Sequence, residues 1–117
     1  MNRFKKLSFT LVVCFALSVS LTASHSSQAA GVAGDAKSGE SLFKGSCKQC
    51  HMVTEDALVG PGLKGVLTSK KKLENGKAAT EANVRSVIKK GGGGMPSYEK
   101  KFTEAQIDDL IAYLKTL

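Results

Sequence analysis

The chain has 117 residues, of which 17 are Lys or Arg and 10 are Asp or Glu, and it contains three cysteines, two histidines and no tryptophan. This length leaves room for one domain. The formal net charge is +7, and residues 31–117 alone hold 14 basic and 10 acidic residues, a net charge of +4. So modest an excess of positive charge makes nucleic acid a poor candidate for the partner.

The first 30 residues have the layout of a secretory signal peptide. Three basic residues precede a mainly apolar run over residues 7–21, and small residues follow up to Ala30. Six serines and threonines between residues 7 and 24 weigh against a retained membrane anchor, because a spanning helix needs about 20 mostly apolar residues. We therefore predict a cleaved signal peptide over residues 1–30, with cleavage after Ala29 or Ala30, and one mature domain over residues 31–117.

The first element of the mature chain is a helix expected over about residues 36–46, with Asp35 as its N-cap. Gly39, Phe43 and Cys47 recur every four residues and so share one face of this helix. A glycine inside a helix costs about 1 kcal/mol relative to alanine. Gly39 therefore indicates that another helix approaches closely at this point.

The segment Cys47-Lys48-Gln49-Cys50-His51 follows that helix directly. Two cysteines separated by two residues and followed by histidine are typical of c-type haem attachment, in which both thiols form thioethers and the imidazole binds iron. Positions three apart lie on one helical face, so both sulfurs can meet the edge of a flat ring. The motif predicts Cys47 and Cys50 as covalent cofactor-binding residues and His51 as a ligand of the iron.

A Cys-x-x-Cys pair alone also suits a thioredoxin-like redox pair, half of a zinc site or a structural disulfide. The only other cysteine and histidine are Cys14 and His25, and both fall in the predicted signal peptide, which leaves no further zinc ligand of these types. A thioredoxin-like protein should also alternate strands with helices, and that periodicity is absent. A haem-free thiol redox protein remains an alternative that an assay for covalent haem decides.

A long irregular segment separates His51 from Thr80 and contains Gly60-Pro61-Gly62-Leu63 and the run Lys70-Lys71-Lys72. Loops of this length are uncommon in compact domains unless they are functional, and wrapping a cofactor is such a function.

Two more helices are expected. The first runs from about Glu81 to Lys90 between the cap Thr80 and the stop Gly91, and the second begins at Glu104 after a capping box formed by Thr103 and Gln106. We expect Leu110 and Tyr113 of the last helix to pack against Gly39 and Phe43. No mature segment alternates with period two, so the predicted fold is all-α, with three to five helices wrapped around one covalently attached haem.

An iron held by His51 has a second axial position, and the mature chain offers two methionines for it. Met52 adjoins His51 on the same side of the ring and cannot reach across, so we expect a packing role for it. Met95 follows four glycines and precedes Pro96, which combines a pliable approach with a rigid turn. Met95 is therefore the predicted second iron ligand.

These motifs resemble the class I cytochromes c, closest to the small soluble monohaem cytochromes of bacteria, over nearly the whole mature chain. The segment from Gly39 to Cys47 is similar to that family's first helix, Gly60 to Leu63 to its proximal loop, and Met95-Pro96 to its distal turn. The resemblance implies one haem c per chain and a hydrogen bond from the His51 ring to the Pro61 carbonyl, with Tyr98 as a further haem-pocket contact. The small cytochrome c fold is the expectation that follows.

The predicted function is a soluble extracytoplasmic one-electron carrier, and not an enzyme, that shuttles electrons between redox complexes. His and Met together fill both axial positions, so the iron is not offered to a substrate. The alternative is a haem-based small-ligand sensor or a peroxidase-like enzyme in which Met95 is labile. No second histidine of the mature chain is available for acid-base work on peroxide.

The expected partners are redox proteins, such as an oxidase, a reductase or a cytochrome complex, with acidic docking surfaces. Many lysines could form a basic face that steers such partners, although they could equally serve only to solvate the surface. We expect a periplasmic or otherwise extracytoplasmic monomer, with no nucleic acid partner and no stable membrane insertion after cleavage. The lysines in question are Lys44, Lys48, Lys64, Lys70, Lys71, Lys72, Lys89, Lys90, Lys100 and Lys101.

Overall fold

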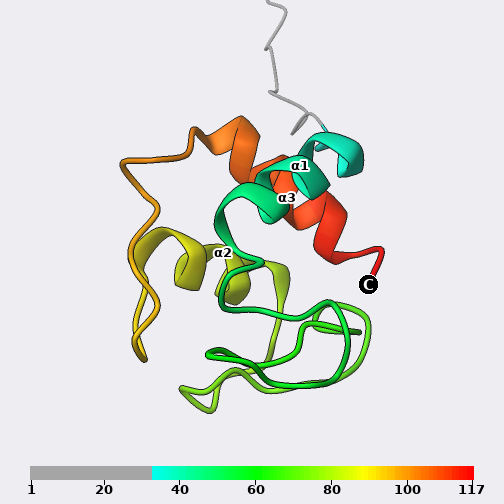
Figure 1. Ribbon diagram of the computed structural model, residues 1–117, viewed down its shortest axis with the longest axis vertical. Helices are drawn as coiled ribbons and strands as arrows, with labels where there is room; N and C mark the ends of the chain where they lie inside the picture. Colours follow the sequence, from blue (N-terminus) through cyan, green and yellow to red (C-terminus); the bar gives the residue numbers. More distant parts are fainter. Residues whose placement is uncertain (1–32) are drawn as a thin grey trace, which may run out of the picture.

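The computed structural model describes residues 33–117, which form three helices joined by long loops (Figure 1). Helix α1 spans Ala36–Ser46, α2 spans Glu81–Lys90 and α3 spans Glu104–Leu114. Within the described residues the only extended pairing consists of two isolated bridges. The all-α prediction is therefore confirmed, and the helix starts agree with those expected from the sequence. The predicted signal peptide lies outside the described residues.

Each helix begins at the cap that the sequence indicates. The Asp35 carboxylate accepts the Ser38 N–H at 2.8 Å at the start of α1. The hydroxyl of Thr80 caps α2 in the same way, and Thr103 with Gln106 forms a complete capping box on α3. Because a helix leaves its first N–H groups without internal partners, these side chains fix where the helices start.

Helices α1 and α3 cross at Gly39, where no side chain could fit. A Cβ at this position would overlap the Asp109 carbonyl and lie 2.9 Å from the Tyr113 Cβ. The ring centroids of Phe43 and Tyr113 are 5.4 Å apart beside the crossing, and Leu110 is buried in the same core. The predicted contact of Tyr113 with Gly39 and Phe43 is confirmed, with the Asp109 backbone as the closest neighbour of Gly39.

Ion pairs join α2 to α3. Arg85 pairs with Asp108 at 2.5 Å, and Lys89 pairs with Glu104 at 2.5 Å. The core beneath these helices is formed by ten apolar residues, which are Phe43, Val66, Ala79, Val84, Ile88, Phe102, Ile107, Leu110, Ile111 and Leu114. Two of these come from the long loop between α1 and α2, so the loop is packed against the helices.

In Figure 1 the crossing of α1 and α3 lies at the top, α2 lies below it, and the loop between α1 and α2 forms the lower end of the molecule. The Gly65 N–H donates to the carbonyl of Leu117 at 2.9 Å, and this bond ties the loop to the end of the chain. Among the described residues, no helix has the length and apolar character that crossing a membrane requires.

Candidate haem site

The cysteine-histidine segment continues α1 as a turn. Cys47 is the C-cap of α1, and its carbonyl accepts the N–H groups of Cys50 at 3.0 Å and His51 at 2.9 Å. Both thiols are free, with Cys47 half-buried and Cys50 exposed. The turn therefore holds two unblocked thiols and an imidazole within one short stretch at the end of a packed helix.

Opposing influences act on the Cys47 thiol. Burial raises the pKa of Cys47 because the thiolate loses its hydration, while the nearby Lys101 ammonium lowers it. The Lys101 Nζ also donates to the Ser46 hydroxyl at 2.9 Å, next to Cys47 in the chain. Lys101 therefore brings a positive charge to the segment that carries the first thiol.

The imidazole of His51 is oriented by the loop that follows it. Its Nδ1 lies 2.9 Å from the carbonyl oxygen of Pro61. Since that oxygen can only accept, Nδ1 carries the hydrogen in this contact, and Nε2 is left with a free lone pair. An imidazole held in this way presents Nε2 as a metal ligand.

Gly60 packs against the same imidazole. A Cβ at this position would lie 2.5 Å from the His51 Cε1 and 2.8 Å from Nδ1, distances that real Cβ atoms do not tolerate. The Gly60 N–H also donates to the carbonyl of Cys50 at 2.8 Å. Gly60 therefore allows the backbone of the loop to pack closely against the His51 ring, which the Pro61 carbonyl orients.

Met95 is reached through four glycines, all with positive φ. The values are 72° for Gly91, 127° for Gly92, 60° for Gly93 and 87° for Gly94. Non-glycine residues rarely adopt this region, so the path of the chain requires glycine here. Gly92 and Met95 exchange two backbone hydrogen bonds, of 2.9 and 3.0 Å, and the Met95 side chain is partly buried against the core.

The residues after Pro96 are fixed to both α2 and α1. The Tyr98 N–H donates to the Ile88 carbonyl at 3.1 Å, and the Ser97 hydroxyl donates to the Lys89 carbonyl at 2.6 Å. The Tyr98 hydroxyl donates to the Ser46 carbonyl at 3.0 Å. This segment therefore connects the end of α2 with the end of α1.

The structure thus brings Pro61 to His51, and it brings Tyr98 to the residue that precedes Cys47. The Tyr98 ring stacks on Phe102 with the centroids 5.2 Å apart. Met52 is 38% exposed and is not one of the buried core residues.

The contact between Ser46 and Lys101 beside Cys47 was not predictable from the sequence. The two residues are 55 positions apart, and no motif connects them. The contact of Gly60 with the His51 ring has one signal in the sequence, which is the place of Gly60 immediately before Pro61.

These residues fit a covalently bound haem. The two free thiols have the required spacing, Nε2 of His51 is available, and Gly60 leaves no Cβ to obstruct the imidazole. A partly buried thioether is present on Met95. Within residues 33–117, no three His, Cys, Asp or Glu side chains gather as a metal-ion site.

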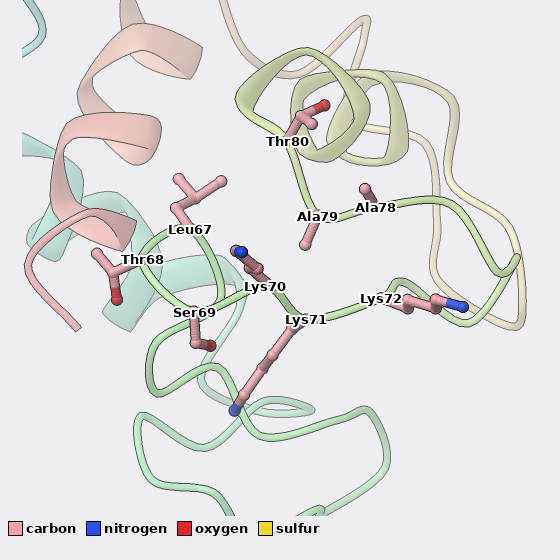
Figure 2. Close-up of a pocket in the computed structure, with 9 residues that line it drawn as sticks. All are labelled: Leu67, Thr68, Ser69, Lys70, Lys71, Lys72, Ala78, Ala79 and Thr80. Atoms are coloured by element: carbon pink, nitrogen blue, oxygen red, sulfur yellow. The ribbon is translucent and has the colours of Figure 1, made fainter.

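A separate cavity of about 430 Å³ lies between residues 67–72 and 78–80 (Figure 2). Figure 2 shows Lys71 pointing away from Ala79 and Thr80, and its Nζ donates to the Lys64 carbonyl at 2.6 Å. None of the predicted haem-binding residues lines this cavity. We therefore assign it no part in the predicted ligand set.

Comparison with known proteins identifies the family. Residues 34–114 match the family model described as cytochrome C oxidase, cbb3-type, subunit III. The chain is 33% identical to a cytochrome c6 from Rippkaea orientalis over 115 residues, which cover 97% of this chain and 92% of that protein. A cytochrome c6 from Thermosynechococcus vestitus is 27% identical over 110 residues, covering 94% and 89% of the two chains.

Solved structures agree. The cytochrome c6 of the diatom Phaeodactylum tricornutum superimposes with a TM-score of 0.57 at 25% identity, covering 71% of this chain and 93% of that one. Cytochrome cH from Methylobacterium extorquens gives a TM-score of 0.52 at 31% identity, covering 72% and 100%. The resemblance found in the sequence is therefore confirmed. The chain belongs to the class I cytochromes c, and it is an electron carrier that holds one haem c per chain.

Proposed function

We propose that Cys47 and Cys50 hold the haem through thioethers, that His51 and Met95 are its axial iron ligands, and that the protein exchanges single electrons with redox partners outside the cytoplasm. When bound, haem c supplies a one-electron iron couple. The observation that carries the proposal is the contact of 2.9 Å between His51 Nδ1 and the Pro61 carbonyl, beside two free thiols.

The Pro61 carbonyl fixes the tautomer of His51 and raises the basicity of Nε2, because it accepts the hydrogen on the other ring nitrogen. Gly60 restricts rotation of the ring, since the backbone of the loop lies close to the ring atoms Cε1, Nδ1 and Nε2. A rigid ligand keeps the same geometry in both oxidation states, and this lowers the reorganisation that accompanies electron transfer.

A carrier role, as opposed to an enzymatic one, is supported by the residues around the predicted ligands. His51 is the only histidine in residues 31–117, so none is left for proton transfer to a bound substrate. Met95 would fill the position at which a sensor or a peroxidase binds its ligand. The alternative with a labile Met95 therefore has no specific observation in its favour.

The distribution of charge supports partners with acidic docking surfaces. Four of the 14 basic residues in the described chain, namely Lys44, Arg85, Lys89 and Lys115, form ion pairs with carboxylates. The other basic residues of that part of the chain form none, and three of them are consecutive at Lys70–Lys72. Positive charge that is not neutralised locally attracts an acidic partner over a distance.

Location outside the cytoplasm is proposed from the signal-peptide pattern of residues 1–30. Mass spectrometry of the exported protein tests it. The expected mass is that of the chain beginning after Ala29 or Ala30, plus the mass of one haem. A mass that includes the apolar run would contradict cleavage.

The ligand assignment is tested by a pyridine haemochrome assay with carbon monoxide binding. We expect one covalent haem per chain, a low-spin spectrum in both oxidation states and slow binding of carbon monoxide. The variants Cys47→Ser and Cys50→Ser should each lose one thioether, which shifts the haemochrome band to the red. High-spin iron or rapid carbon monoxide binding by the wild type would favour the sensor or peroxidase alternative.

A further inference from the structure

Met95 is held differently on its two sides. The four glycines before it all have positive φ and, because they carry no side chains, add no side-chain packing of their own. The three residues after Pro96 are bonded to the chain around them, with Ser97 and Glu99 bonded to the Lys89 carbonyl and Tyr98 to the Ile88 carbonyl. The two backbone hydrogen bonds between Gly92 and Met95 lie within the turn itself. The turn is joined to α2 by one hydrogen bond before Met95, from the Gly91 N–H to the Val87 carbonyl, and by three after it, so the later segment contributes more to the position of Met95.

That segment is also tied to the end of α1. The Tyr98 hydroxyl donates to the Ser46 carbonyl at 3.0 Å, and the Lys101 Nζ donates to the Ser46 hydroxyl at 2.9 Å. Ser46 is the last residue of α1, so its carbonyl has no partner inside the helix and is available to a donor from outside. Cys47 follows at once, so the contacts reach the segment that carries the first thiol.

A single turn of chain brings both donors to Ser46. The Tyr98 carbonyl accepts the N–H groups of Lys101 and Phe102, each at 2.9 Å. The Lys101 Nζ lies 5.4 Å from the centre of the Tyr98 ring, which in turn stacks on the buried Phe102. The turn is therefore anchored in the core, and the backbone that carries the two donors, Tyr98 and Lys101, is held in place.

We propose that Tyr98 and Lys101 are positioning residues that clamp the Met95 segment to the end of α1 and thereby hold the thioether of Met95 on the iron. This inference rests on the proposed ligation by Met95. The clamp matters for electron transfer, because a methionine that leaves the iron changes both the potential and the reorganisation on each turnover. The glycines alone would let the segment move away.

The test is competition between Met95 and added imidazole for the oxidised iron of the holoprotein. Tyr98→Phe removes only the hydroxyl and keeps the ring on Phe102. We expect imidazole to bind about fivefold more tightly to this variant than to the wild type, the factor that corresponds to one lost hydrogen bond. Ser46→Ala removes the acceptor for Lys101 and should give a smaller change in the same direction.

Tyr113→Phe is the matched control. It makes the same chemical change on α3, where the Tyr113 ring packs on Phe43 and its hydroxyl has no hydrogen-bond partner among the described residues. We expect imidazole affinity equal to that of the wild type. Unfolding curves of all three variants, followed by far-ultraviolet circular dichroism, show whether a change in imidazole affinity exceeds the change in global stability.

The outcomes separate the two proposals. Equal imidazole affinity of Tyr98→Phe and Tyr113→Phe, in a protein whose oxidised wild type shows the weak far-red band of a methionine–iron bond, would overturn the clamp alone. Absence of that band from the wild type would overturn ligation by Met95, and the clamp with it. A tighter imidazole complex for Tyr98→Phe, with a change in imidazole affinity that exceeds the change in global stability, would support the clamp.

Discussion

The carbonyl oxygen of Pro61 lies 2.9 Å from Nδ1 of His51, ten residues away in the chain. The contact orients the one imidazole in residues 31–117, and the backbone at Gly60 packs against the same ring. The orientation of the His51 ring is therefore set by the backbone of a loop.

Gly60→Ala should disrupt this arrangement. The added Cβ would lie 2.5 Å from the His51 Cε1, so either the ring or the loop must shift. We expect the free energy of unfolding of the holoprotein to fall by about 1–3 kcal/mol, as is usual for overpacking. Denaturant unfolding measures this loss, and the reduction potential should change as well, because the imidazole moves.

Gly45→Ala is the control for Gly60→Ala. A Cβ at Gly45 would meet nothing within 4 Å, and the position lies inside α1. Alanine should stabilise the protein by up to about 1 kcal/mol there. Equal effects of the two substitutions would show that Gly60 has no special contact with the ring.

Gly39→Ala should be strongly destabilising, although alanine is the better helix former. The new Cβ would overlap the Asp109 carbonyl, which belongs to the backbone of α3 and cannot rotate away. We expect a loss of at least about 2 kcal/mol in denaturant unfolding. Truncation of the neighbouring side chain by Tyr113→Ala in the same protein should not restore stability, and a restoration would indicate that the clash involves the side chain.

The stability of the protein should fall at alkaline pH in a way that depends on Tyr98. Burial raises the pKa of Tyr98 above its ordinary value of 10.0, so the folded protein keeps the hydroxyl proton longer than the unfolded chain does. This contribution is fully present below pH 10 and is lost as the pH rises through the folded pKa. Urea midpoints measured between pH 8 and about 11 should therefore decline less steeply for Tyr98→Phe than for the wild type.

The same slope in Tyr98→Phe and the wild type would contradict this prediction. Tyr113 is the reference for the effect of burial alone on a phenol. Burial raises the pKa of Tyr113 as well, but its hydroxyl has no hydrogen-bond partner among the described residues. Titration followed by the phenolate absorbance measures the ionisation of Tyr98 and of Tyr113 directly.

Electron transfer with an acidic redox partner should depend on where positive charge is removed. The double variant Lys70→Gln/Lys72→Gln should lower the bimolecular rate severalfold at low salt, with the difference lost as salt rises. The double variant Lys44→Gln/Lys115→Gln makes the same change in net charge. Since Lys44 and Lys115 pair with Glu40 and Glu81, its effect should be smaller.

Equal rates for the two double variants would show that net charge alone steers the partner. Stopped-flow kinetics over a range of ionic strengths gives the comparison.

The sequence predicted those features that depend on neighbouring residues. Asp35, Thr80 and Thr103 are helix caps because short polar side chains bond to N–H groups three residues on. Gly39 indicated a close helix contact, because glycine is costly inside a helix.

Features that depend on distant residues were not predictable. Tyr98 and Ser46 are separated by 52 positions, and the bond uses a backbone carbonyl, which every residue possesses. The contact of the Asp109 carbonyl with Gly39 was not predictable for the same reason. The exposure of Met52 likewise follows from the path of the loop, which local pattern does not determine.

The most direct test of the His51 and Met95 ligation is the oxidised absorption spectrum of Met95→Ala, with Met52→Ala as the control. Both variants remove a methionine thioether, but Met52 is exposed and Met95 is partly buried against the core. We predict that the wild type and Met52→Ala show the weak far-red methionine–iron band and bind carbon monoxide slowly, whereas Met95→Ala loses the band and binds it rapidly. Persistence of the band in Met95→Ala would contradict the assignment.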